Sequence, residues 1–157
     1  IYTGEDTLSL HDALPICQNA GYMQAFGNTF AADDATAVTA ALALNDTVDL
    51  IRIPGGVRLH ELEFDNGDCD TGTALVVKIG YRSLGGSLAT VDDAFGTGFT
   101  FLQAASTNTG RTRIAVPPMN FNEDVMVFAT VTTAAAGQSA GDKTITSFAK
   151  GITRGCK

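Results

Sequence analysis

The polar turn DNGDCDTG, residues 65–72, is the most suggestive polar constellation in the sequence. Three of its side chains, Asp65, Asp68 and Asp70, carry carboxylate oxygens of the kind that Ca²⁺ prefers in a flexible loop. The spacing only partly resembles an EF-hand loop, because no bidentate glutamate follows at the right distance and no helices flank it. The other interpretation is a turn whose Asp and Asn side chains cap their own backbone. We favour this interpretation, with no cofactor, and keep the calcium site as the alternative.

A second set of reactive side chains is His60 with the neighbouring Glu61 and Glu63. The two glutamates could serve as an acid and base pair, but solvated carboxylates on a sheet surface are far commoner, and glycosidase carboxylates flank a cleft. A lone strand histidine is more often a surface or packing residue than a ligand or base. The two Gly-Gly pairs lack the lysine and helix of a phosphate loop. We therefore predict no catalytic residue and expect a protein that is not an enzyme.

The first 17 residues need separate treatment. Thr7–Ile16, TLSLHDALPI, looks like the translation of a widely used sequencing-library adapter, and Ile1–Thr3 looks like the preceding adapter segment. We interpret residues 1–17 as an assembly artefact in a metagenome-derived gene and exclude them from fold reasoning. The Ser, His and Asp inside this segment also lie too close in sequence to form a hydrolase triad.

Composition limits the class of protein. The 157 residues suit one domain, and 17% charged residues, 17 glycines and no tryptophan suit short strands and turns better than long surface helices. A net charge of −7, with scattered basic residues, opposes nucleic-acid binding. No apolar stretch approaches the roughly 20 residues that span a bilayer, so we expect no membrane partner. Three cysteines give no disulfide framework or zinc pattern, and a Cys69–Cys156 bridge is left open.

Alternating apolar residues predict strands through most of the chain. Thr73–Tyr81 alternates with a period of two, which predicts a strand with one face buried. In residues 57–64 the alternation changes phase at His60-Glu61. A β-bulge at that point would place four apolar side chains on one face: Val57, Leu59, Leu62 and Phe64.

The remaining strands predict the fold class. They cover residues 35–44, 50–53, 113–116, 125–132 and 143–148. Pro117-Pro118 would end the third of these strands, because proline cannot continue a central ladder. Residues 82–98 are expected to form a long exposed loop or a distorted hairpin, and Phe99–Leu102 a short strand or core anchor. About seven or eight short antiparallel strands predict an all-β, single-domain β-sandwich or jelly roll over residues 35–157.

Residues 18–34 precede this domain as an N-terminal arm. Three aromatic residues, Tyr22, Phe26 and Phe30, lie four apart, which could mark a helical face, but glycine and asparagine residues interrupt it. We prefer an extended arm pinned by its aromatic side chains. These three residues are our candidates for contacts with a partner protein, and residues 82–98 and 134–142 are our two candidate contact loops.

Several motifs carry a family resemblance. They are Leu50–Gly56 (LIRIPGG), Phe64–Asn66, Asp70–Ala74 (DTGTA) with Val77–Tyr81, and a later block from Phe121 to Gly141 that includes Val131–Ala136 (VTTAAA). Over residues 38–150 the chain resembles small structural proteins of tailed bacteriophages. The DTGTA turn and the strand after it are the most specific part of this resemblance.

The resemblance implies a non-enzymatic virion protein, a capsid decoration or head-stabilising protein on the capsid surface. Its partners would be the major capsid protein and copies of itself, and it would bridge capsid subunits. The family pattern has no catalytic residues to carry over. The alternative function is a calcium-assisted carbohydrate-binding β-sandwich of a tail tip or a secreted protein, which would use the three aspartates of the polar turn. The absence of tryptophan opposes that alternative, since sugar rings stack on aromatic side chains.

Overall fold

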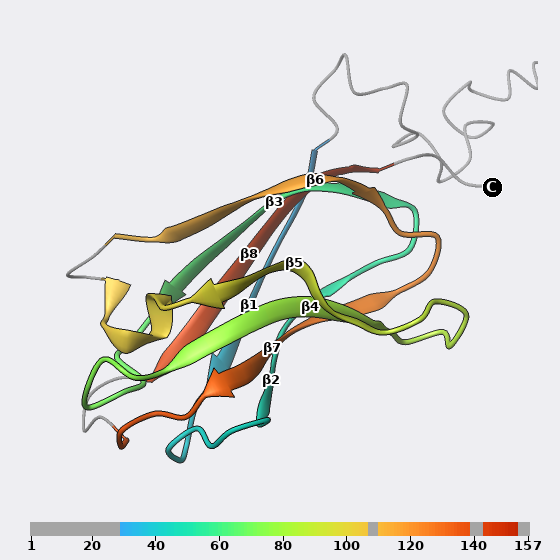
Figure 1. The fold of residues 1–157 in the computed structure, drawn as a ribbon. Coiled ribbons are helices and arrows are strands. Elements are labelled where there is room, and N and C mark those ends of the chain that lie inside the picture. Colours follow the sequence, from blue (N-terminus) through green and yellow to red (C-terminus); the bar gives the residue numbers. More distant parts are fainter. Residues whose placement is uncertain (1–28, 107–109, 139–142, 154–157) are drawn as a thin grey trace, which may run out of the picture.

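A computed structural model describes residues 29–106, 110–138 and 143–153 of the chain. Eight strands form two four-stranded antiparallel sheets, with the order β1-β8-β3-β6 in the first sheet and β2-β7-β4-β5 in the second (Figure 1). The elements are β1 (Thr29–Ala37), β2 (Thr47–Ile53), β3 (Val57–Asn66), β4 (Val76–Ser83), β5 (Val91–Phe99), the short 3₁₀ helix η3 (Phe101–Gln103), β6 (Thr112–Asn120), β7 (Val125–Thr133) and β8 (Thr144–Thr153). This strand order is that of a jelly roll, and it confirms the predicted all-β sandwich.

The connections between strands gather at two opposite ends of the sandwich. Every connection except the β4–β5 hairpin crosses from one sheet to the other. We call the end with connections 54–56, 84–90 and 121–124 the Glu123 end, and the end with connections 38–46, 67–75 and 134–143 the Asp70 end. Because Thr29 pairs with Ile152, the described chain both starts and finishes at the Glu123 end.

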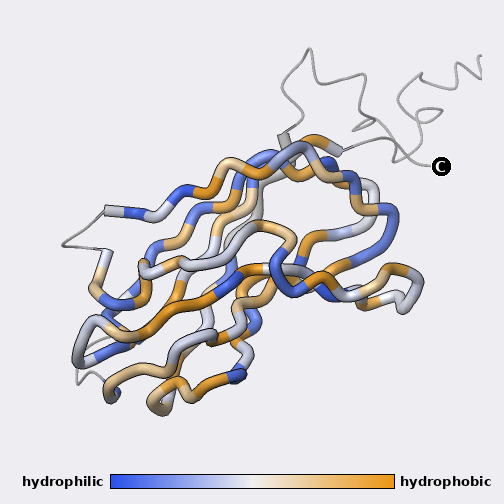
Figure 2. Tube along the Cα trace, in the orientation of Figure 1, coloured by the Kyte–Doolittle hydropathy of each residue, from blue (hydrophilic) through white to orange (hydrophobic). Residues whose placement is uncertain are grey.

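The core lies between the two sheets, and both sheets supply it. Hydrophobic and hydrophilic residues alternate along the strands, as the colours of Figure 2 show. The largest fully buried side chains include Leu50, Ile51, Ile53, Leu75, Ile79, Leu102 and Ile145. Leu102 belongs to η3, so the segment that sequence analysis expected to be a short strand or core anchor is a core anchor.

The predicted β-bulge is present in β3. The pairing of β3 with both β6 and β8 shifts register between Leu59 and Glu61. As a result the apolar residues on either side of the shift all face the core: Val57 is 1% exposed, and Leu59, Leu62 and Phe64 are 0% exposed.

The prediction that Pro117-Pro118 ends a strand is wrong. β6 continues through both prolines to Asn120. Two features allow this: β6 is at the edge of its sheet, and the prolines lie opposite the β3 bulge, between the paired positions Ala115 and Met119. Proline is tolerated at edges and bulges, because no ladder hydrogen bond is needed from its nitrogen there.

The predicted strand over residues 35–44 is also placed wrongly. β1 starts earlier, at Thr29, and ends at Ala37, so residues 29–34, which we assigned to the arm, belong to the sheet. Residues 38–46 form a loop whose alternation has another cause, since Val38 and Leu42 are buried without being in a strand. A tight turn closes this loop, with Asn45 at a φ of 68°.

The segment 82–98 forms the distorted hairpin that was one of its two predicted structures. β5 pairs with β4, and the register shifts twice, between Val77 and Ile79 and between Ile79 and Tyr81. A connection of seven residues, 84–90, joins the two strands at the Glu123 end.

Candidate interaction surfaces

The Asp70 end is organised by one buried carboxylate. Asp70 is 1% exposed, and its two oxygens accept hydrogen bonds from four backbone N–H groups. Three of the donors are in its own turn, at Gly72, Ala74 and Leu75, and the fourth is Ala136 of the β7–β8 connection, at 2.7 Å. Burial raises the pKa of this carboxyl group, but the four N–H groups outweigh burial and hold the pKa below its ordinary value. Asp70 therefore joins two connections that are distant in sequence.

The three predicted calcium ligands have different partners. The Oδ1 atom of Asp68 accepts the N–H of Asp70 at 3.1 Å, and Asp65 forms an ion pair with Arg111 at 3.2 Å. No group of three or more His, Cys, Asp or Glu side chains that could hold a metal ion occurs within the described ranges. The arrangement of Asp68 and Asp70 is the self-capped turn that we favoured, and calcium binding stays a prediction for experiment. Cys69 is buried in this turn, and Cys156 lies outside the described residues, so their pairing stays open.

The Glu123 end is organised by a second carboxylate. Glu123 is in the turn between β6 and β7, and its oxygens accept hydrogen bonds from the Ser83 hydroxyl group and from the backbone N–H groups of Ser87 and Leu88. The Ser83 hydroxyl, which makes the strongest contribution, and these N–H groups together lower the pKa of Glu123 despite the opposing effect of desolvation. The carboxylate thus fixes the loop 84–90 to the β6–β7 turn.

Asp124 fixes the third connection at the same end. Its Oδ1 atom accepts the N–H of Gly55 at 2.8 Å, and its other oxygen pairs with Arg52 at the end of β2. The N–H of Gly55, which contributes most, and the Arg52 guanidinium lower the pKa of Asp124. Two adjacent carboxylates in one turn therefore hold both neighbouring connections.

Sequence analysis missed the roles of Glu123 and Asp124. The sequence feature that could have revealed these roles is the acidic pair in the segment FNED. This segment lies between two strands and follows shortly after two prolines. Acidic residues in such a turn often accept backbone N–H groups. Their partners lie up to 72 residues away in sequence, as with Asp124 and Arg52, so only the fold brings them together.

The outer face of the first sheet carries a network of charges. Glu61 accepts a hydrogen bond from Lys150 at 2.8 Å, and Glu63 lies within 3.8 Å of both Arg111 and Arg113. The hydrogen bond from Lys150, as the largest cause, lowers the pKa of Glu61, and the same contact raises the pKa of Lys150. Both glutamates are therefore ion-paired on this face, and Glu63 is buried, with only 8% of the residue exposed.

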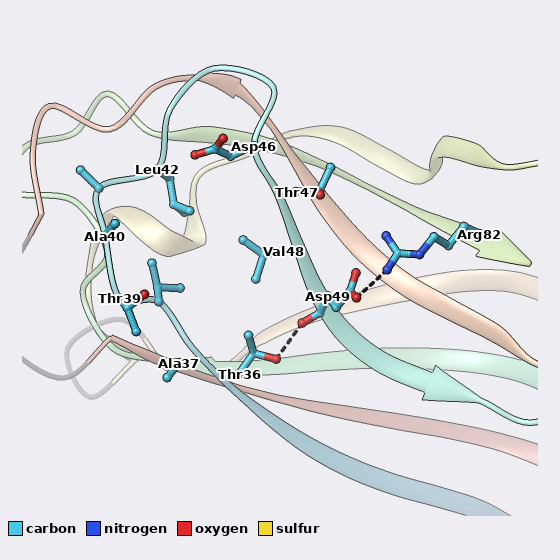
Figure 3. Close-up of a pocket in the computed structure, with 12 residues that line it drawn as sticks. Thr36, Ala37, Thr39, Ala40, Leu42, Asp46, Thr47, Val48, Asp49 and Arg82 are labelled. Atoms are coloured by element: carbon cyan, nitrogen blue, oxygen red, sulfur yellow. Dashed lines mark hydrogen bonds and ion pairs between the residues drawn. The ribbon is translucent and has the colours of Figure 1, made fainter. Parts of the chain in front are cut away.

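A cavity of about 370 Å³ lies along the open edge between β1 and β2 (Figure 3). The Thr36 hydroxyl group donates to the backbone oxygen of Asp49 at 2.7 Å, and the Asp49 carboxylate pairs with Arg82 at 2.5 Å. Small and aliphatic side chains supply most of the remaining lining. Of the charged side chains in this lining, Asp49 and Arg82 pair with each other, and the Asp46 carboxylate accepts the N–H of Ala43 at 2.8 Å.

The structure separates the two candidate contact loops and places one arm residue. The loop 84–90, within the segment 82–98, lies at the Glu123 end, whereas residues 134–138 lie at the Asp70 end. Phe30 is in β1, where its backbone pairs with Gly151 of β8. Tyr22 and Phe26 lie outside the described residues. None of the described residues forms a helix with the length and hydropathy that a membrane crossing needs.

The fold is shared with chains of known phage capsids. A chain in a structure of the capsid of Ralstonia phage GP4 matches with a TM-score of 0.64 and 22% identity, over 81% of this chain and 85% of that chain. A chain in the capsid asymmetric unit of cyanophage Pam1 matches with a TM-score of 0.57 and 13% identity, over 80% and 85% of the two chains. A chain in the acid-stable capsid of Helicobacter pylori bacteriophage KHP30 matches with a TM-score of 0.52 and 12% identity, over 80% and 88%.

This chain therefore shares its jelly-roll fold with these three capsid chains. Each match covers a similar share of this chain and of the capsid chain, so the capsid chains are close to this chain in length. No protein-family model and no curated protein sequence matches the chain.

Proposed function

We propose that this protein is a non-enzymatic structural component of a phage virion that decorates and stabilises the capsid surface. The observation that supports this proposal best is the shared jelly roll: three phage capsids contain a chain of the same fold and of similar length. The organisation of the described residues agrees with such a role. The carboxylates of Asp70, Glu123 and Asp124 accept backbone hydrogen bonds and hold the surface connections in place.

The mechanism that we propose is mechanical. Many copies would each contact more than one subunit of the shell, made of the major capsid protein, and would also contact one another. The apolar area buried in each contact would then add free energy to the assembled particle. Symmetric repetition would multiply a modest contact over the whole shell.

Pairing through exposed strand edges is not part of this mechanism. The four edge strands of the sandwich are β1, β6, β2 and β5. β6 carries two prolines, the register of β2 shifts between Asp49 and Ile51, and β5 contains Gly96 and Gly98 at positive φ. In β1 the Asp34 carboxylate accepts the N–H of Ala35. Such features protect edges against strand addition, so we place the contacts on connections and on the arm.

The test is a shell-binding experiment with the full chain. Empty shells are assembled from the major capsid protein of the phage that encodes this chain, mixed with the purified protein and sedimented. We expect saturable co-sedimentation, regular extra density on the shell by electron cryo-microscopy, and a higher melting temperature of the decorated shell. Protein that stays in the supernatant at concentrations well above 10 μM, or density only in a tail, would contradict the proposal.

A further inference from the structure

The loop 84–90 carries an exposed apolar side chain on a fixed backbone. Within the described ranges two large hydrophobic side chains are exposed, Leu84 at 47% and Leu44 at 58%. They lie at opposite ends of the sandwich: Leu84 in the β4–β5 connection at the Glu123 end, and Leu44 in the β1–β2 connection at the Asp70 end. Figure 1 shows the β4–β5 connection projecting outward beyond the sheets.

The loop backbone is held by hydrogen bonds along its length. The N–H of Leu84 donates to the backbone oxygen of Asp124 at 2.8 Å, and the N–H of Gly86 donates to the Ser83 hydroxyl at 2.5 Å. The N–H groups of Ser87 and Leu88 donate to Glu123. The backbone lies so close to this carboxylate that a Cβ atom on Gly85 would be 2.5 Å from Glu123 Oε2. A loop that is already fixed loses less conformational entropy when it binds, and this favours affinity.

The charge of the loop points to the chemistry of its partner. Residues 84–90, LGGSLAT, carry no charge, although the whole chain has a net charge of −7. A loop without charged side chains forms no ion pair with a partner, and the core of a protein interface is poor in charged residues, so the partner site that fits this loop is apolar. The first described residue, Thr29, pairs with Ile152 at this same end of the sandwich.

We infer that Leu84 inserts into an apolar pocket on the capsid shell protein, and that Glu123 is the positioning residue that presents it. The inference rests on the proposed function and adds the contact residue, the end of the molecule that faces the shell and the chemistry of the partner site. Leu44, with a larger exposed fraction but at the far end, is then directed away from the shell.

The test compares Leu84→Asp with the matched control Leu44→Asp in the full chain. Both side chains are exposed, so both variants are expected to keep the melting temperature of the unmodified chain. We expect Leu84→Asp to weaken co-sedimentation with empty shells by about 10- to 100-fold, the range for losing one buried leucine. Leu44→Asp is expected to bind as the unmodified chain does.

A third variant, Glu123→Gln, tests the positioning role. It places an amide where N–H groups of the loop donate, so we expect faster hydrogen exchange at Gly86, Ser87 and Leu88 and about 3- to 10-fold weaker shell binding. Equal binding of Leu84→Asp and the unmodified chain, or a loss with Leu44→Asp alone, would overturn the inference while leaving the decoration function standing. Faster exchange with unchanged binding would overturn the role of Glu123. Failure of the unmodified chain to bind would reject the decoration function itself.

Discussion

At the scale of single residues, the Asp70 carboxylate is notable because four backbone N–H groups donate hydrogen bonds to it. Its four hydrogen bonds link the polar turn after β3 to the connection after β7. An acidic residue whose partners are all backbone N–H groups acts on structure, and this one is almost fully buried.

The first prediction is that Asp70→Asn destabilises the domain by about 3 kcal/mol. The new NH₂ group would face N–H donors, leaving buried donors without an acceptor, and each such loss costs about 1–3 kcal/mol. Asp68→Asn is the control, because Asp68 is more exposed and accepts one bond from its own turn. Urea unfolding followed by circular dichroism measures both variants. Equal stability of the two variants would contradict this role.

The second prediction concerns calcium. Since both oxygens of Asp70 accept backbone N–H groups and Asp65 pairs with Arg111, we expect neither 5 mM Ca²⁺ nor a chelator to change the melting temperature by more than about 1 °C. Differential scanning fluorimetry with Mg²⁺ as the control ion gives the result. A clear rise in the melting temperature with Ca²⁺ but not with Mg²⁺ would instead support a metal site on the three aspartates, and with it the carbohydrate-binding alternative.

At the scale of elements, the sequence predicted strands correctly where apolar and polar residues alternate because one face of the strand packs against the core. β3 and β4 have one face against the core, so their period of two and the phase change at His60 were informative. Prediction failed at β1 and in the loop 38–46. Val38 and Leu42 are buried by the tertiary packing of this loop, so its apolar residues alternate in the sequence as they would in a strand. It failed at β6 because the site that tolerates proline is created by the bulge of a different strand.

Close approach of β4 and β5 gives the third prediction. A Cβ atom on Gly80 would lie 2.0 Å from the backbone oxygen of Val91 and 2.5 Å from Asp92 backbone atoms. Because backbone cannot move aside as a flexible side chain can, we expect Gly80→Ala to cost more than about 3 kcal/mol. Gly98→Ala is the control, since its Cβ would meet open space and only its positive φ is strained, at about 1–2 kcal/mol. Thermal unfolding of the two variants should rank them in this order.

The fourth prediction is an acid-dependent loosening of the loop 84–90. The pKa of Glu123 lies below its ordinary value of 4.5, so the carboxylate stabilises the loop fully above that pH. The stabilisation is lost as the pH falls below 4.5 and through the pKa of the folded state. Hydrogen exchange at Ser87 and Leu88, corrected for intrinsic rates, should therefore rise between pH 5 and pH 3 in the unmodified chain. Glu123→Gln should show little such change, and an identical rise in that variant would contradict the assignment.

At the scale of the whole molecule, sequence patterns predicted the all-β sandwich class but not the order of its strands. Counting strands predicted about seven or eight of them, but strand order depends on which edges meet, and alternation carries no such information. The candidate surfaces were predicted in part. The segment 82–98 was identified as a contact candidate from its length and composition, whereas the carboxylates that fix its loop are distant in sequence.

The fifth prediction separates the arm from the sheet. Deleting residues 1–28 removes no residue of β1, so we expect an unchanged melting temperature, together with weaker shell binding if Tyr22 and Phe26 dock. Deleting residues 1–34 also removes six residues that pair with β8, and should lower the melting temperature by several degrees. Calorimetry and shell co-sedimentation of both truncations provide the measurements. Full shell binding after the shorter deletion would rule out the arm as a contact.

The meeting of Thr29 and Ile152 at the Glu123 end has a practical consequence for protein engineering. A fluorescent protein or affinity tag fused directly before Thr29 or directly after Thr153 would emerge on the side that we propose to face the shell, and would obstruct assembly. An antigen peptide inserted into the β7–β8 connection, at the opposite end, would point outward in every copy. The same particle would then act as a multivalent display scaffold, provided that the insertion spares the N–H group of Ala136, on which Asp70 depends.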